Sequence, residues 1–117
     1  MSQSFGRQVR LRARAEFVAV QGQGRRIASR HLTLLALPNT LGVNRLGVVA
    51  SRRLGGAVQR NRAKRRLREM FRATQPEVPV TGQAYDIVVI PRREITSHVF
   101  SELKSEFDAA LRKLHAR

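Results

Sequence analysis

The sequence contains no cysteine, only eight acidic residues, and aromatic side chains at only 5% of its positions. Without cysteine the chain forms no disulfide framework and offers no thiolate to a metal, and a reducing compartment is compatible with it. No apolar run approaches the roughly 20 residues that cross a bilayer. The first six residues also lack the apolar segment of a secretion signal. We therefore expect a cytoplasmic protein.

Basic residues dominate what is present. The chain has 23 lysines and arginines, a formal net charge of +15 and a pI near 12.0. Such a charge indicates a polyanionic partner, and nucleic acid is favoured over a membrane surface. At 117 residues and 42% hydrophobic content, the chain is long enough for one domain with a modest core. We assign residues 1–12 to a flexible basic arm and residues 13–117 to a single RNA-binding domain.

The segment Ser51–Arg72 holds nine of the 23 basic residues in 22 positions. From Ala57 onward it lacks glycine and proline, which predicts a helix. Helical spacing places an apolar stripe on one side, made of Ala63, Leu67, Met70, Phe71 and Thr74. The opposite side carries Asn61, Lys64, Arg65, Arg68 and Arg72, with Arg62 and Arg66 on one flank and Arg60 on the other.

A solvated charged helix is the ordinary interpretation of such a run. Solvated helices usually mix charges of both signs, because pairs spaced four residues apart support them. Here seven cations between Arg60 and Arg72 meet only Glu69, so their repulsion costs stability unless an anion offsets it. Arginine outnumbers lysine six to one in that span, and its planar guanidinium suits phosphate contact and base stacking. The pattern favours a polyanion-binding face.

The remaining segments predict an α+β sandwich, a small sheet with helices on it. A short helix over Ala13–Gln21 ends at Gly22 and Gly24, and it carries Phe17, which is either a core residue or an exposed stacking residue. Strands are predicted over Ile27–Leu37, Val43–Ser51 and Tyr85–Ile90, the first two as an antiparallel hairpin around a turn at Pro38–Gly42. Residues 75–82 form the main loop, and Thr96 or Ser97 caps a final amphipathic helix with apolar residues Phe100, Leu103, Phe107, Ala110, Leu111 and Leu114.

Residues for catalysis are scarce. His31, His98 and His115 fall in separate segments, and none has a carboxylate at metal-ligand or catalytic-triad spacing. The pair Gly55-Gly56 before the basic helix could expose backbone N–H groups to phosphate, but it does not match a nucleotide-hydrolysing P-loop. The basic helix is therefore expected to be a docking surface, and no catalytic residue is predicted.

The segment Ala57–Arg68, preceded by Ser51-Arg52-Arg53-Leu54-Gly55, resembles the protein subunit of bacterial ribonuclease P. The Arg60-Asn61-Arg62 spacing after a loop of serine, two basic residues, an apolar residue and glycine is distinctive. The likeness extends to four further stretches: Arg14–Phe17, residues 30–39, Arg45–Val48 and Tyr85–Ile90.

The resemblance implies an accessory subunit of a ribonucleoprotein endonuclease whose RNA is the catalyst and holds the required Mg²⁺. The protein would bind that RNA and the 5′ leader of precursor tRNA, assisting removal of the leader to give the mature tRNA 5′ end. It also implies a fold similar to the second domain of ribosomal protein S5. That fold is a two-layer α-β-β-β-α-β-α sandwich with a mixed sheet of about four strands, and its βαβ crossover is left-handed, whereas the right-handed connection is the rule.

Carried over residue by residue, the resemblance assigns two sets of side chains. The leader set is Phe17, Arg60, Asn61, Lys64 and Arg68, and the set for the catalytic RNA is Arg52, Arg53, Arg62, Arg65 and Arg66. The chain departs from the family pattern at three positions: Gln21 and Leu35 replace aromatic residues, and Gly56 replaces a polar one. These departures reduce the expected stacking on leader bases.

The sequence is also compatible with two other functions. One is a ribosomal protein or ribosome-assembly factor, which would co-purify with ribosomal subunits. The other is a DNA-binding architectural protein, for which duplex DNA would outcompete structured RNA.

Overall fold

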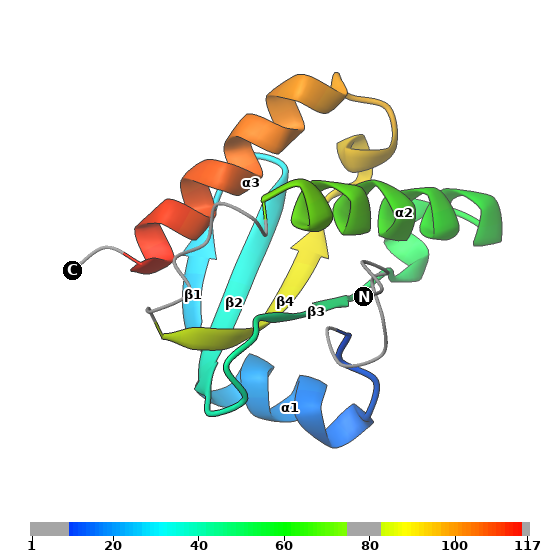
Figure 1. The fold of residues 1–117 in the computed structure, drawn as a ribbon. Helices are drawn as coiled ribbons and strands as arrows, with labels where there is room; N and C mark the ends of the chain where they lie inside the picture. The colour runs from blue at the N-terminus through cyan, green and yellow to red at the C-terminus, as the bar shows by residue number, and fades with distance from the viewer. Residues whose placement is uncertain (1–9, 75–82, 116–117) are drawn as a thin grey trace, which may run out of the picture.

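The computed structural model describes residues 10–74 and 83–115. In chain order the elements are α1 (Arg14–Gln23), β1 (Arg25–Ala28), β2 (Leu32–Asn39), β3 (Arg45–Val48), η2 (Arg52–Leu54), α2 (Ala57–Thr74), β4 (Ala84–Pro91), η4 (Arg93–Thr96) and α3 (Phe100–His115). The four strands form one mixed sheet with the helices packed on it (Figure 1). This confirms the α+β class and the α-β-β-β-α-β-α order.

The strand order is β1-β2-β4-β3, so β4 lies between β2 and β3. β2 pairs antiparallel with both β1 and β4, whereas β3 pairs parallel with β4 through the crossover helix α2. The predicted hairpin of the second and third strands is therefore wrong. The hairpin is instead β1–β2, because the segment Ile27–Leu37 is broken by a tight turn in which the backbone N–H and the hydroxyl of Ser29 both donate to the carbonyl of Leu32.

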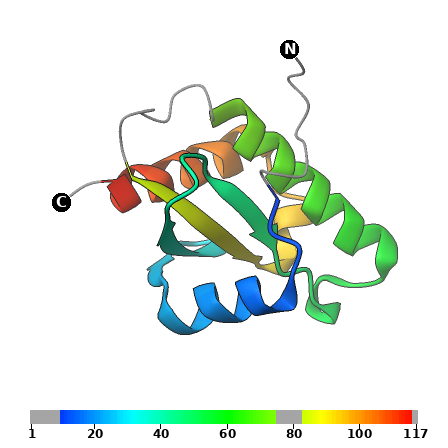
Figure 2. The same cartoon turned by 60° about the horizontal axis from the view of Figure 1, so that its bottom comes forward.

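Both faces of the sheet are covered. α2 and α3 pack on one face, where Leu34 of β2 and Ile87 of β4 lie in the main core. α1 packs on the other face, where Leu35 and Val88 form a smaller cluster with Val20 of α1. Figure 2 shows this layering, with α1 on one side of the sheet and the other two helices behind it.

The apolar stripe of α2 is buried as predicted: Ala63, Leu67, Met70, Phe71 and Thr74 are at most 4% exposed. The stripe of α3 is also confirmed, with Phe100 only half-buried. The predicted helix ends are less accurate. α1 continues through Gly22 and ends with Gly24 as its C-cap. α3 begins at Phe100, since Thr96 closes the separate short helix η4.

Most of the predicted N-terminal arm, and the predicted loop over residues 75–82, lie outside the described residues. Of the arm's described residues, Arg10 pairs with Leu46 in a parallel bridge, and the buried Leu11 donates its N–H to the carbonyl of Leu46. The segment before α1 thus runs along the outer edge of β3. Among the described helices, none is long and apolar enough to cross a membrane.

Candidate nucleic-acid interface

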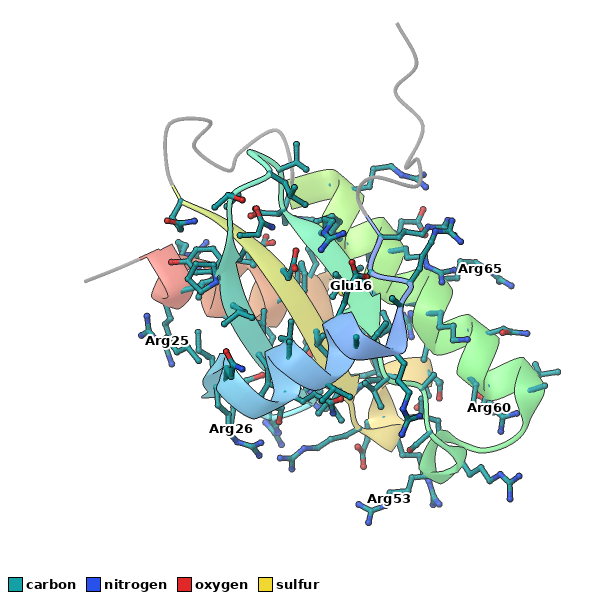
Figure 3. All side chains as sticks on the ribbon, turned by 90° about the horizontal axis from the view of Figure 1, so that it is seen from below. Glu16, Arg25, Arg26, Arg53, Arg60 and Arg65 are labelled. Carbon is teal, nitrogen blue, oxygen red and sulfur yellow. The ribbon has the colours of Figure 1, made fainter. Side chains whose placement is uncertain are left out.

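The exposed side of α2 borders a groove of about 470 Å³, here called the α2 groove. Its lining contains five cations and one carboxylate: Arg10, Lys64, Arg65, Arg68 and Arg72 with Glu69, together with Asn61. Because Arg10 precedes α1, the groove joins the basic helix to the segment along β3. Figure 3 shows Arg60 and Arg65 directed outward from α2.

Like charges crowd this groove. Burial lowers the pKa of Arg68, and the nearby guanidinium groups of Arg10 and Arg12 lower it further. An arginine keeps its charge at neutral pH even so. Independently of this pKa, five cations around one carboxylate make the potential of the groove positive, which favours an anion there. Such a groove suits phosphate binding.

A second hollow, of about 720 Å³, opens on the sheet face that α1 partly covers; we call it the sheet cleft. Four arginines line it, Arg26, Arg53, Arg92 and Arg93, over an apolar floor that includes Val49 and Ile90. Sequence reasoning found Arg53 but missed the other three. β1 and η4 are far apart in the chain, and only the β1–β2–β4 pairing brings their arginines together.

Arg62 and Arg66, predicted on one flank of α2, have different surroundings. Arg62 is exposed and lines a hollow of about 640 Å³ shared with Arg93 and η4. Arg66 is half-buried, and its Nη1 and Nη2 each donate to a backbone carbonyl, of Ile95 and His98, at 3.0 Å. Burial lowers the pKa of Arg66, and the charge of Arg62 lowers it further. Arg66 therefore fastens α2 to the segment before α3.

The N-terminal end of α2 carries the remaining predicted cations. Arg60 donates to the carbonyl of Gly55 at 3.0 Å, so its guanidinium folds back over the glycine pair. Arg52 and Arg53 are exposed on η2, which Ser51 caps by accepting from the backbone N–H of Arg53. In Figure 3 Arg53 stands below the end of α2 that carries Arg60. The connection from β3 to α2 thus carries Arg52 and Arg53 on η2 and leads to Arg60 in the first turn of α2.

Phe17 lies on the sheet cleft side of the molecule and is half-buried against the smaller cluster. Its ring abuts the backbone of Gly47 on β3. The structure therefore gives Phe17 a packing contact and leaves part of the ring accessible. Of the residues that replace family aromatics, Gln21 is exposed on α1, whereas Leu35 is buried beneath that helix.

A polar network ties α1 to the sheet beside Phe17. Nε and Nη2 of Arg45 each donate to a carboxylate oxygen of Asp86 at 2.8 Å, and Nη1 donates to Glu16 at 3.1 Å. Asn39 adds a second donor to Asp86. Burial raises the pKa of Asp86, but the hydrogen bonds from Arg45 and Asn39 outweigh it and hold the pKa below its ordinary value. Arg45 thereby joins three elements, α1, β3 and β4.

Two histidines that the sequence placed in separate segments meet in the structure. The rings of His31 and His98 stack with centroids 4.4 Å apart. Glu106 bonds Nδ1 of His31 at 2.8 Å, and Glu102 bonds Nε2 of His98 at 2.8 Å. Burial raises the pKa of Glu106, but hydrogen bonds from Ser29 and His31 hold it below its usual range. Both carboxylates come from α3. His31 and Glu106 are 75 residues apart, so sequence spacing could not reveal that pair, whereas His98 and Glu102 are only four residues apart.

Metal ligation has no candidate in the described part of the chain, since no three His, Cys, Asp or Glu side chains converge there. The α2 groove and the sheet cleft are lined by guanidinium and ammonium groups and by the amide of Asn61, and the half-buried ring of Phe17 lies on the same face as the sheet cleft. These groups bind phosphates and stack on bases.

Comparison with known proteins identifies the family. The family model described as Ribonuclease P matches residues 5–115. The ribonuclease P protein component of Petrotoga mobilis is 34% identical over 118 residues, which cover 97% of this chain and 98% of that protein. The component of Symbiobacterium thermophilum is 43% identical over 100 residues, covering 85% and 84%.

Solved structures agree. The RNase P protein from Thermotoga maritima superposes with a TM-score of 0.79 at 31% identity, over 89% of this chain and 96% of that one. The RNase P protein of Staphylococcus aureus gives a TM-score of 0.76 at 27% identity, over 91% and 94%. The basic helix, the fold around it and these matches together show that the chain belongs to the ribonuclease P protein family.

Proposed function

We propose that this chain is the protein component of a bacterial ribonuclease P, a ribonucleoprotein that removes the 5′ leader of precursor tRNA. The observation that carries the proposal is the α2 groove, where five cations face a single carboxylate. Such a surface needs a polyanion, and family membership indicates that the polyanion is RNA. The ribosomal and DNA-binding alternatives are disfavoured for the same reason.

The chain's part in the reaction is binding. The RNA subunit is the catalyst, and we assign the Mg²⁺ of the reaction to that RNA. The protein would hold the catalytic RNA and the leader of precursor tRNA together in the cytoplasm, which lets cleavage proceed at lower Mg²⁺. Phosphate contacts supply most of this affinity and make it dependent on salt.

The leader set is Phe17, Arg60, Asn61, Lys64 and Arg68, and the RNA-subunit set is Arg52, Arg53, Arg62, Arg65 and Arg66. Three members of the leader set line the α2 groove, which supports their grouping. Arg65 lines the same groove, so the two proposed surfaces meet along α2. Arg66 already binds two carbonyls, and we assign it a supporting role at the edge of the RNA surface.

The sheet cleft extends the leader surface. A single strand that lies over Phe17 would continue onto Arg26, Arg92 and Arg93, whose guanidinium groups can follow its phosphates. The apolar floor of the cleft suits unpaired bases better than a duplex, because a paired base does not expose its face.

Reconstitution with the RNA subunit from the same source tests the function. Cleavage of a precursor tRNA is measured over a Mg²⁺ series with and without protein, and we expect the protein to restore cleavage at low Mg²⁺. Equal cleavage in both series refutes the proposal. Arg112→Ala is a matched control, because it removes an exposed cation of α3 outside the three hollows described here.

Leader contact is tested separately with precursor tRNAs whose leaders differ in length. We expect affinity to rise with leader length when protein is present, and the Phe17→Ala variant to lose most of that gain. An affinity that is the same for every leader length would exclude the leader surface, even if the protein still assists cleavage.

A further inference from the structure

The ring of Phe17 fills the space that a side chain at Gly47 would need. Gly47 is buried in β3, and a Cβ added there would lie 2.6 Å from both Cε1 and Cζ of Phe17. The same atom would lie 3.1 Å from Cβ of Leu11. Gly47 has no positive φ, so β3 itself tolerates alanine, and the glycine is needed for the space that the ring fills.

A second device fixes the backbone that carries the ring. Glu16 directly precedes Phe17, and its Oε1 accepts from the backbone N–H groups of Arg12 and Ala13 at the start of α1. Its Oε2 accepts from Arg45, which also grips Asp86 through two hydrogen bonds. Burial raises the pKa of Glu16, but these backbone and guanidinium partners hold it below its usual value, so the carboxylate stays ionised.

Both contacts come from β3 and both act on the first turn of α1. Arg45 and Gly47 are alternate residues of β3, and their side-chain positions therefore face the same side of the sheet. Arg45 fixes the distance of the start of α1 from the sheet through its hydrogen bond to Glu16. Because Gly47 has no side chain, the ring of Phe17 can pack directly on β3. The ring thereby packs against β3 while Phe17 as a whole remains only half-buried.

We propose that Gly47 and Arg45 are positioning residues for the leader, because they set the depth and orientation of Phe17 on the sheet face that carries the sheet cleft. This inference rests on the proposed function. Stacking of an unpaired base on an aromatic ring depends on offset and tilt, and a ring displaced by a methyl group presents a different face. A ring already seated on the strand also loses little freedom when a base binds.

The test compares Gly47→Ala with Phe17→Ala in the reconstituted holoenzyme. The measured quantity is the leader gain, defined as the affinity for precursor tRNA with a leader divided by the affinity for the same tRNA without one. Loss of one base-stacking contact predicts that Phe17→Ala lowers the leader gain about tenfold. We expect Gly47→Ala to lower it by a similar factor, while affinity for the RNA subunit alone stays unchanged.

Gly22→Ala is the matched control, since a Cβ at that position of α1 meets nothing within 4 Å. It should leave the leader gain and the melting temperature as in the parent, or raise the latter slightly because alanine favours a helix. Glu16→Gln is a milder variant that keeps an amide oxygen for the helix start and loses the ion pair with Arg45. We expect it to lower the leader gain about threefold, because losing one charged hydrogen bond to Arg45 should shift the ring of Phe17 only partly.

The double variant Phe17→Ala/Gly47→Ala decides between positioning and general damage. If Gly47 acts through the ring, the double variant has the leader gain of Phe17→Ala alone, because the ring is already absent. Independent, multiplicative losses overturn the proposal, as does a Gly47→Ala protein that keeps its full leader gain while Phe17→Ala loses it. If Phe17→Ala itself keeps the gain, the inference fails. Protein-dependent cleavage at low Mg²⁺ then still tests the proposed function by itself.

Discussion

Removing exposed cations from α2 should change how strongly RNA binding depends on salt. Arg62 and Arg65 suit this experiment because both are exposed, and neither guanidinium is among the hydrogen bonds that hold the described fold together. Arg60 and Arg66 do not suit it, since each binds backbone carbonyls of the loops beside α2. The double variant Arg62→Ala/Arg65→Ala therefore removes two charges and leaves the fold intact.

The magnitude follows from counterion release. Each phosphate that a cation neutralises contributes about 0.7 to the slope of log K against log salt for single strands, and about 0.9 for a duplex. Two lost contacts should therefore flatten the slope by about 1.4 to 1.8. Affinity for the RNA subunit is measured by filter binding between low and moderate salt, with the slope as the result rather than any single affinity.

A control of equal charge separates local contacts from the general field of the protein. Arg112→Ala/Lys113→Ala also removes two exposed cations, but from the end of α3. We expect its slope to stay close to that of the parent. If both double variants flatten the slope equally, net charge alone explains binding, and the assignment of Arg62 and Arg65 to the RNA subunit is refuted.

Two further predictions concern stability. Arg66→Ala should lower the free energy of unfolding by about 2 kcal/mol, because the carbonyls of Ile95 and His98 lose a charged donor. Urea unfolding measures this change. An unchanged urea midpoint would contradict the supporting role of Arg66. For pH, the carboxylate of Asp86 has a folded pKa below the ordinary 3.8, so its stabilising pairing with Arg45 is complete above that value and is lost as the pH falls below it. The melting temperature should therefore drop steeply below about pH 4 in the parent and less steeply in Asp86→Asn, and parallel curves for the two proteins would exclude this assignment.

The helices could be predicted from the sequence because their determinants are local. An apolar residue every three or four positions predicts which side of α2 is buried, and all five stripe residues are buried as the spacing requires. The absence of glycine and proline from Ala57 to Thr74 predicts the length of α2. The cationic side then follows by exclusion, which is why the groove lined by Lys64 and Arg68 could be anticipated without a structure.

Strand order was not predictable in the same way, because pairing partners are distant in sequence. A short connection favoured a hairpin between β2 and β3, yet β4 separates them. The composition of the strands does indicate which strand is central. β4 contains the run Ile87–Ile90, apolar on both faces, which is typical of a central strand, whereas β3 alternates Leu46 and Val48 with Arg45 and Gly47. Weighing that contrast would have placed β4 inside the sheet and β3 at its edge.

The partners of individual arginines were also beyond the sequence. Arg66 binds carbonyls 29 and 32 residues away, and the sheet cleft joins Arg26 to Arg92 across β1, β2 and β4. Helical spacing placed Arg66 beside Arg62 on one flank and so suggested the same role for both. Their burial separates them, because a guanidinium already held by two carbonyls has fewer donors left for phosphate.

The fixed position of α2 explains how one helix could serve the two proposed RNA surfaces. Its apolar stripe packs into the main core, and Arg66 ties one flank to the segment before α3, so α2 cannot roll to spread its charges. The cations opposite the apolar stripe remain close together. Burial lowers the pKa of Arg68, and the charges of Arg10 and Arg12 lower it further. Repulsion among these cations is present without RNA, and phosphates bound as proposed would relieve it without any reordering of the helix, which would favour tight association. Crowded charge on a rigid helix is therefore better suited to binding RNA than the same charges on a flexible segment would be.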